Sequence, residues 1–98
     1  MLKAQLLLHF KRQYADSTIM EVVIWKLPNP DKYHPHGHKY RLHYGTLDGT
    51  CIVRFDNEKR KGDHRHFYDT EKPYLFTTID QLTSDFFADI AKSKRHKK

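Results

Sequence analysis

The chain has 98 residues, a length that fits one domain with a single hydrophobic core. Aromatic residues make up 13% of it, which argues against a disordered chain because disordered segments are poor in aromatics. The single cysteine, Cys51, excludes an internal disulfide and is typical of a reducing cytoplasm, and no apolar run reaches the roughly 20 residues of a membrane span.

The net charge of +6 is unevenly distributed along the chain. Five cations follow residue 91 and no acid follows Asp89, so residues 1–91 carry only +1. We therefore expect one domain over residues 1–91 and a basic, disordered tail over residues 92–98. Such a tail attracts nucleic acid through its charge, or serves only as a solubilising end.

Alternating polarity predicts the first strands. Over residues 3–10, Ala4, Leu6, Leu8 and Phe10 point to one side, and only Leu7 breaks the alternation. Asp16 and Ser17 favour a turn, and the run of β-branched residues over 18–27 predicts a central strand antiparallel to the first. Three prolines and a glycine then predict a loop over residues 28–37.

Three more strands and a helix are expected in the rest of the chain. The strands cover residues 38–45, 50–56 and 74–78, and "TLDG" joins the first two in a tight hairpin. Thr78 and Gln81 form a capping-box pattern, and an apolar stripe at helical spacing predicts a helix from Ile79 to Ala91 or Lys92. The fold class is therefore α+β: a mostly antiparallel sheet of about five strands, with the C-terminal helix on one face.

The other face of this sheet is predicted to be cationic, with tyrosines between the charges. In register, it carries Lys3, His9, Lys11, Lys39, Arg41, His43 and Arg54. Phosphate contacts and base stacking make such a surface a candidate for nucleic-acid binding, with Lys39, Arg41, His43, Arg54, Lys59 and Arg60 as its residues. An exposed face of an antiparallel sheet is also charged simply because it faces water, so both interpretations stay open.

The stretch "KGDHRH", residues 61–66, concentrates reactive side chains. If it is extended, His64 and His66 project to one side, where one imidazole can act as base and the other as acid near neutral pH. Arg65 or Lys61 would offset charge on a phosphoryl group, and Asp63 would orient an imidazole. Such a set would cleave RNA without a metal or other cofactor, using the 2′-hydroxyl as nucleophile. A polar surface turn is the alternative.

A metal site is a weaker interpretation of the same region. Asp56, Glu58, His64 and His66 supply carboxylate and imidazole groups that can bind a divalent ion and activate water. The histidines of "HPHGH", residues 34–38, lie in a predicted loop, and we expect them to be incidental.

Several stretches of the chain resemble the TumE family of bacterial and phage toxins. They are "LLLHFKRQYADSTIMEVVIWKLP", "HKYRLHYG" and above all "FDNEKRKGDHRH", followed by "EKPYLF". The similarity runs from Lys3 to about Ala91 and is most specific over residues 56–66. The family commonly has glycine at the position before Lys61, where this chain has Arg60.

The resemblance implies a small cytoplasmic toxin of a type II system, neutralised by direct binding of an antitoxin that carries a DNA-binding helix-turn-helix. It also places the functional region at residues 56–66. Many toxins of this size are ribonucleases that act on messenger RNA, so by analogy we expect RNA cleavage. The alternatives are a module that binds nucleic acid or protein without cutting it, or a metal-dependent nuclease. An exposed sheet edge would allow a homodimer.

Overall fold

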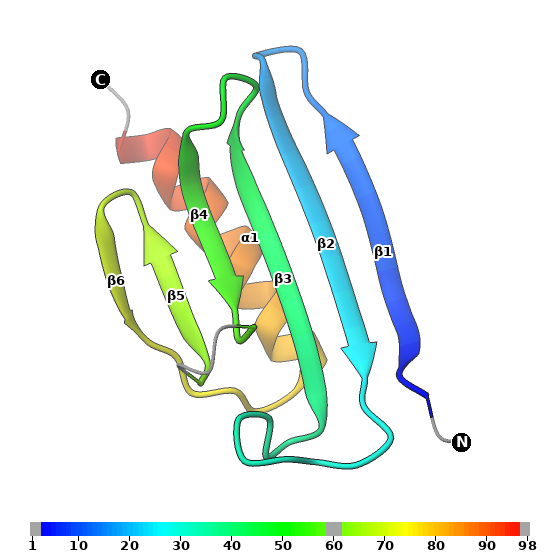
Figure 1. The fold of residues 1–98 in the computed structure, drawn as a ribbon. Coiled ribbons are helices and arrows are strands. Elements are labelled where there is room, and N and C mark those ends of the chain that lie inside the picture. The colour runs from blue at the N-terminus through cyan, green and yellow to red at the C-terminus, as the bar shows by residue number, and fades with distance from the viewer. Residues whose placement is uncertain (1–2, 59–61, 97–98) are drawn as a thin grey trace.

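The structure, a computed structural model, describes residues 3–58 and 62–96. Within these residues, six strands form one antiparallel sheet in chain order, and a single helix follows them (Figure 1). The strands are β1 (Gln5–Gln13), β2 (Thr18–Lys26), β3 (His38–Thr46), β4 (Cys51–Asp56), β5 (His64–Phe67) and β6 (Thr70–Pro73), and α1 spans Ile79–His96. The α+β class is confirmed, with one strand more than expected.

Two predicted turns form as their side chains dictate. The backbone N–H of Thr18 donates to the Asp16 carboxylate at 3.1 Å, which closes the turn between β1 and β2. The N–H of Thr50 donates to the Asp48 carboxylate at 3.0 Å in the hairpin between β3 and β4. Gly49, the residue after Asp48, has a φ of 100°, a backbone conformation that favours glycine.

The hairpin between β5 and β6 has no recognisable turn sequence. Phe67 pairs with Thr70, so the turn consists of Tyr68 and Asp69 alone, and Tyr68 adopts a φ of 54°. Tyrosine rarely occupies this region, which is why the sequence did not predict β6. The strand expected over residues 74–78 was wrong, because this segment connects β6 to α1 without regular structure.

A bulge at Leu7 changes the faces of β1. Leu6 pairs with Trp25 and Leu8 pairs with Ile24, so Leu7 has no partner in the ladder. The extra residue turns Leu6 to the side of Trp25, whereas Leu8 and Phe10 share the side of Ile24 and Val22. The prediction that Leu6, Leu8 and Phe10 share one face is therefore wrong for Leu6.

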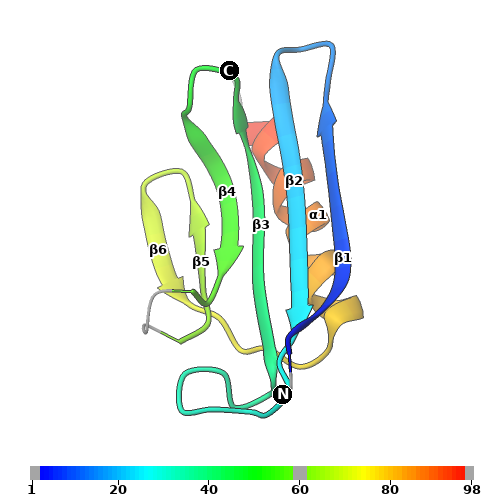
Figure 2. The same ribbon diagram turned by 45° about the vertical axis from the view of Figure 1, so that its right-hand side comes forward.

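The core lies between α1 and one face of the sheet. It is built from alternate residues of β2, β3 and β4 and from the helical stripe, namely Met20, Val22, Ile24, Tyr40, Leu42, Tyr44, Val53, Phe55, Leu82, Phe86 and Ile90. The turned view in Figure 2 also shows α1 against a single face of the sheet. All side chains that alternate with these core residues therefore point to the helix-free face.

Helix α1 begins as predicted and continues further than predicted. The backbone N–H of Gln81 donates to the Thr78 hydroxyl at 3.0 Å, so Thr78 is the N-cap. The helix extends to His96, and it places the Lys92 ammonium 4.8 Å from the ring of Phe67 on β5. Lys92, Lys94 and Arg95, expected in a tail, are thus helical.

Candidate functional site on the helix-free face

The strand register aligns polar residues across the helix-free face. From β1 to β6, each of the following pairs with the next: Lys11, Glu21, His43, Arg54, His66 and Glu71. We call this the first polar row. A second polar row beside it runs through His9, Val23, Arg41, Asp56, His64 and Pro73. Both histidines of the "KGDHRH" stretch therefore lie among charges supplied by other strands.

His64 and Asp56 are the buried polar members of the second polar row, and the side chain of His64 is 7% exposed. Its Nδ1 lies 3.1 Å from the Gly62 carbonyl and its Nε2 lies 2.9 Å from Asp56 Oδ1. Among the described residues, Asp56 Oδ1 nonetheless makes no hydrogen bond, because the angle of its contact with His64 is unsuitable for one. The two side chains are therefore in ion-pair contact only. Acceptors thus face both ring nitrogens of His64, and little of the ring is open to a substrate.

His66 is the more accessible of the two histidines. Its side chain is 23% exposed, and its Nε2 lies 2.8 Å from a carboxylate oxygen of Glu71 on β6. The rings of His64 and His66 are 6.1 Å apart between centroids. Glu71 also lies 3.6 Å from His64, so one carboxylate contacts both imidazoles.

Arg54 lies between two histidines in the first polar row. It pairs with His66 on one side and with His43 on the other. Its Nε is 3.0 Å from Asp56 Oδ2, although this contact too lacks hydrogen-bond alignment. Asp56 thus holds the guanidinium of Arg54 while His64 contacts the other oxygen of the same carboxylate.

His43 is half-buried between two arginines. Burial lowers the pKa of its imidazole, and the positive charges of Arg41 and Arg54 lower it further. A pKa below the ordinary value of about 6.5 keeps the ring neutral at pH 7. His43 is therefore a proton acceptor in the same row as Arg54 and His66.

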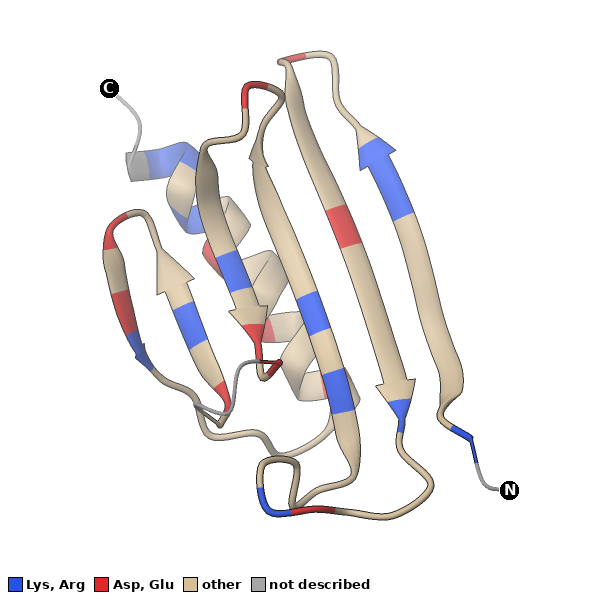
Figure 3. Ribbon diagram, viewed as in Figure 1, with Lys and Arg blue, Asp and Glu red and all other residues tan. Residues whose placement is uncertain are grey.

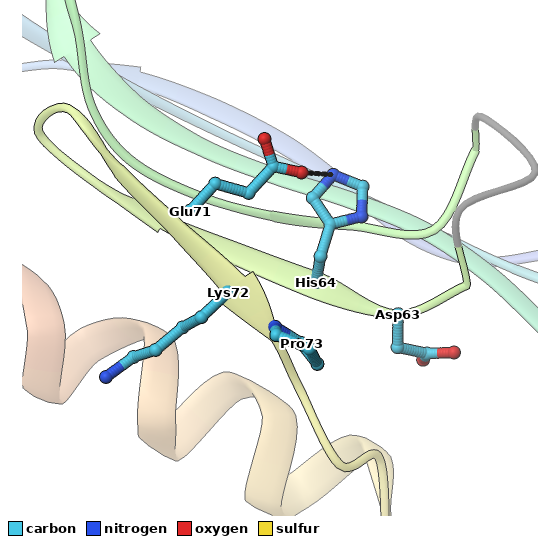
Figure 4. A pocket seen from close by; sticks show the side chains of 5 residues that line it. All are labelled: Asp63, His64, Glu71, Lys72 and Pro73. Carbon is cyan, nitrogen blue, oxygen red and sulfur yellow. Dashed lines mark ion pairs between the residues drawn. The ribbon is translucent and has the colours of Figure 1, made fainter.

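A hollow of about 320 Å³ opens beside His64, where β5 begins and β6 ends. Its lining consists of Asp63, His64, Glu71, Lys72 and Pro73, shown in Figure 4. The side chains of His64 and Glu71 face one another there, whereas the carboxylate of Asp63 points away from the imidazole.

Asp63 does not orient either histidine of the pair. Its carboxylate lies 2.8 Å from His36 Nε2 and accepts a hydrogen bond from the Tyr40 hydroxyl at 2.7 Å. The Nδ1 of His36 accepts the N–H of His38 at 3.1 Å, and the His36 ring stacks on Phe76 with centroids 3.9 Å apart. Asp63 therefore fastens the histidine-rich loop to the start of β5.

Arg65 lies on the opposite face of the sheet from His64 and His66. Its guanidinium contacts Asp89 of α1 at 2.7 Å and lies over the rings of Phe55 and Tyr74, at 4.7 Å and 5.5 Å from their centroids. The structure thus does not bring Arg65 together with the two histidines.

The described residues expected to bind nucleic acid share the helix-free face: Lys39, Arg41, His43 and Arg54. Figure 3 shows lysine and arginine positions along β3 and β4, with acidic positions on β2 and β6 to either side. Glu21 contacts Arg41 at 3.8 Å, so the face is mixed rather than purely basic. The tyrosines of β3 are buried in the core and cannot stack on bases. Lys59, Arg60 and Lys61 lie outside the described residues.

The four residues of the metal interpretation are only partly assembled. Asp56 and His64 are in contact and His66 is adjacent, but Glu58 is exposed beyond the end of β4. Over residues 3–58 and 62–96, no group of three or more His, Cys, Asp or Glu side chains has the arrangement of a metal site.

Comparison with known families agrees with the resemblance seen in the sequence. The family model described as "Toxin TumE" matches residues 3–94. The chain belongs to the TumE toxin family. No curated protein and no solved structure shows significant similarity to it. In the described part of this TumE toxin, no helix has the length and apolar character needed to cross a membrane.

Sequence reasoning missed the acidic half of the TumE toxin site. Glu71 contacts both histidines, yet it lies on β6, a strand that the sequence did not predict. Glu21 lies in the strand over residues 18–27, which was predicted from its β-branched residues and assigned no functional residue. The signal that could have found it is the register, because Glu21, His43 and Arg54 become neighbours only when three strands are aligned.

Proposed function

We propose that this TumE toxin acts by cleaving RNA without a metal ion, at the centre of the first polar row. The observation that carries the proposal is the alignment of His43, Arg54 and His66 on three adjacent strands. Strands are about 4.8 Å apart, so the Cα atoms of the two histidines are roughly 10 Å apart, with the arginine between them. A phosphodiester above Arg54 would then have an imidazole on either side.

In the proposed reaction, neutral His43 is the base. It takes the proton of the 2′-hydroxyl, whose oxygen attacks the phosphorus atom. His66, whose Nε2 lies 2.8 Å from the Glu71 carboxylate, acts in its protonated form and gives a proton to the departing 5′-oxygen. Arg54 offsets the charge that builds up on the phosphoryl oxygens. The products are a 2′,3′-cyclic phosphate and a free 5′-hydroxyl.

His64 has a positioning role in this proposal, in place of the acid–base role expected from the sequence. Its buried ring contacts the Asp56 carboxylate, which in turn contacts Arg54. Through Asp56, His64 fixes the guanidinium against β4. The exposed ring of His66 and the neutral ring of His43 suit proton transfer better than a ring with acceptors at both nitrogens.

The test is incubation of the purified toxin with labelled single-stranded RNA, with and without EDTA. We expect cleavage in both, with products that end in a cyclic phosphate. His43→Gln and His66→Gln should each slow cleavage about 100-fold or more, the range found for removal of a general acid or base. His34→Gln, in the loop outside the site, is the matched control and should leave the rate unchanged.

Three outcomes would contradict the proposal. Cleavage abolished by EDTA would indicate a metal-dependent nuclease. Retarded but intact RNA would indicate a binding module. Growth inhibition that survives both His43→Gln and His66→Gln would mean that these residues are not the catalytic pair.

A further inference from the structure

Strand β1 is an open sheet edge. All nine of its residues are exposed, and its outer side has no neighbouring strand among the described residues. The other edge, β6, has only four residues and carries Glu71, Lys72 and Pro73, which are typical of edges that resist pairing. The two edges thus differ in length and chemistry, and β1 is the one suited to an added strand.

Exposed apolar side chains concentrate on this edge. Leu6, Leu7, Leu8 and Phe10 are each 36–47% exposed. The register places Leu8 and Phe10 on the helix side of the sheet, beyond the reach of α1. On α1, Phe87 is 45% exposed. Lys94 lies two turns further along the same side of the helix, and its ammonium is 5.7 Å from the ring of Tyr14, just after β1. An apolar surface therefore continues from β1 towards the flank of α1.

A hollow lies on the other side of the same edge. It measures about 210 Å³ and is lined by Ala4, Trp25, Leu27 and Lys39. Leu6 pairs with Trp25, one of the residues that line it. The edge is therefore apolar on the helix-free side only near its N-terminal end, and it is apolar on the helix side at Leu8 and Phe10.

The positive charge of the β1 edge indicates which kind of partner would bind there. Lys3, Lys11 and Arg12 are its cations, and residues 3–15 contain no aspartate or glutamate. A second copy of this chain would bring a second set of cations to the same edge, which disfavours self-pairing. An added strand with acidic side chains on the helix-free side would gain attraction to Lys11, while its apolar side chains on the helix side covered Leu8 and Phe10. Arg12, on the helix side at the end of β1, adds a further cation to the edge.

We propose that β1 is the docking edge for an extended segment of the antitoxin, in which acidic and apolar residues alternate and which adds to the sheet as a seventh strand. Main-chain hydrogen bonds to β1 supply affinity, and the alternating side chains supply specificity. The proposal rests on the toxin family, which implies an antitoxin partner, and not on RNA cleavage. The two can therefore fail separately.

A nine-residue peptide in which glutamate and valine alternate is the probe. We expect it to bind the full chain and to slow amide hydrogen exchange in residues 5–13. A peptide with lysine in place of glutamate should not bind. Phe10→Lys and the double variant Lys11→Glu/Arg12→Glu should each weaken binding of the acidic peptide about tenfold or more, and the double variant should bind the lysine peptide instead. Lys32→Glu, a charge reversal in the 28–37 loop, is the matched control.

The same variants are then co-produced with the companion antitoxin. The double variant should lose co-purification with it, whereas Lys32→Glu should retain it. The proposal is overturned if the peptide does not protect β1, if protection falls on another strand, or if neither variant changes the affinity. A dimer of the chain that Phe10→Lys dissociates would show that a second copy occupies the edge. Circular dichroism of each variant establishes that it is folded.

Discussion

Replacement of Arg65 separates a structural role from a phosphate-binding role. The sequence assigned Arg65 to the catalytic set, whereas its guanidinium contacts Asp89 and covers the rings of Phe55 and Tyr74 on the helix side. We expect Arg65→Met to lower stability and to leave RNA cleavage intact in the fraction that remains folded. Methionine keeps much of the apolar stem and removes only the charge and its contacts.

The size of the loss follows from these contacts. Asp89 is 12% exposed, and a buried charge deprived of its partner costs about 3–5 kcal/mol, whereas an exposed pair contributes under about 1 kcal/mol. Because Arg65 is still 26% exposed, about 2 kcal/mol is reasonable for the ion pair. The two cation–π contacts add about 1 kcal/mol together. A total of about 3 kcal/mol lowers the Tm of a domain of this size by roughly 12–24 °C.

The assay combines thermal unfolding with RNA cleavage measured well below the Tm of the variant. The double variant Arg65→Met/Asp89→Leu removes both charges and should recover most of the lost stability, because no buried charge is then left without a partner. An Arg65→Met protein that is as stable as the original but no longer cleaves RNA would refute the reasoning. It would mean that Arg65 reaches the substrate despite its place on the helix side.

Three other predictions concern the sheet. Burial and two arginines lower the pKa of His43, so the unfolded chain binds a proton at this imidazole at higher pH than the folded chain does. Stability should therefore fall as the pH drops below about 6.5. In melting curves measured over a series of pH values, His43→Gln should reduce that fall. Asn57→Ala should lower the free energy of unfolding measured in denaturant by about 2–4 kcal/mol, because the buried side-chain amide accepts a hydrogen bond from the N–H of Tyr40 at 3.0 Å and donates one to the carbonyl of His38 at 2.8 Å. An unchanged midpoint would show that water replaces the amide. Gly45→Ala should cost roughly 3 kcal/mol or more and reduce the yield of folded protein, because its Cβ would lie 2.2 Å from the backbone oxygen of Thr50, just before β4. A normal melting curve would contradict the hairpin geometry.

The parts of the fold that sequence predicted are those with a local signal. β-Branched residues predicted β2 and alternation predicted β3 and β4, each within one residue at either end, and Thr78 marked the start of α1. Leu7, the residue that broke the alternation of β1, became a bulge. The hairpin at Tyr68 was missed because its turn depends on a left-handed tyrosine, which no residue preference favours.

The candidate site was predictable only in part, because it is assembled across strands. The period of two separated His64 and His66 from Arg65 correctly, but it could not show that Asp63 binds His36 from a loop 27 residues earlier. Nor could it show that Glu71 contacts both histidines, since this needs the register of β5 with β6. Local pattern thus gives the face of a side chain, and tertiary pairing gives its neighbours.

The order of elements along the chain determines when each face of the sheet is completed. Every strand pairs with its neighbour in sequence, so the hairpins form one after another without distant segments having to meet, an arrangement that favours rapid folding. The helix is synthesised after all six strands, and the row of Val22, Leu42 and Phe55 stays open to water until the helix packs on it. A translation product that stops before residue 79 would keep both polar rows but present an uncovered apolar surface, and aggregation or proteolysis would remove it.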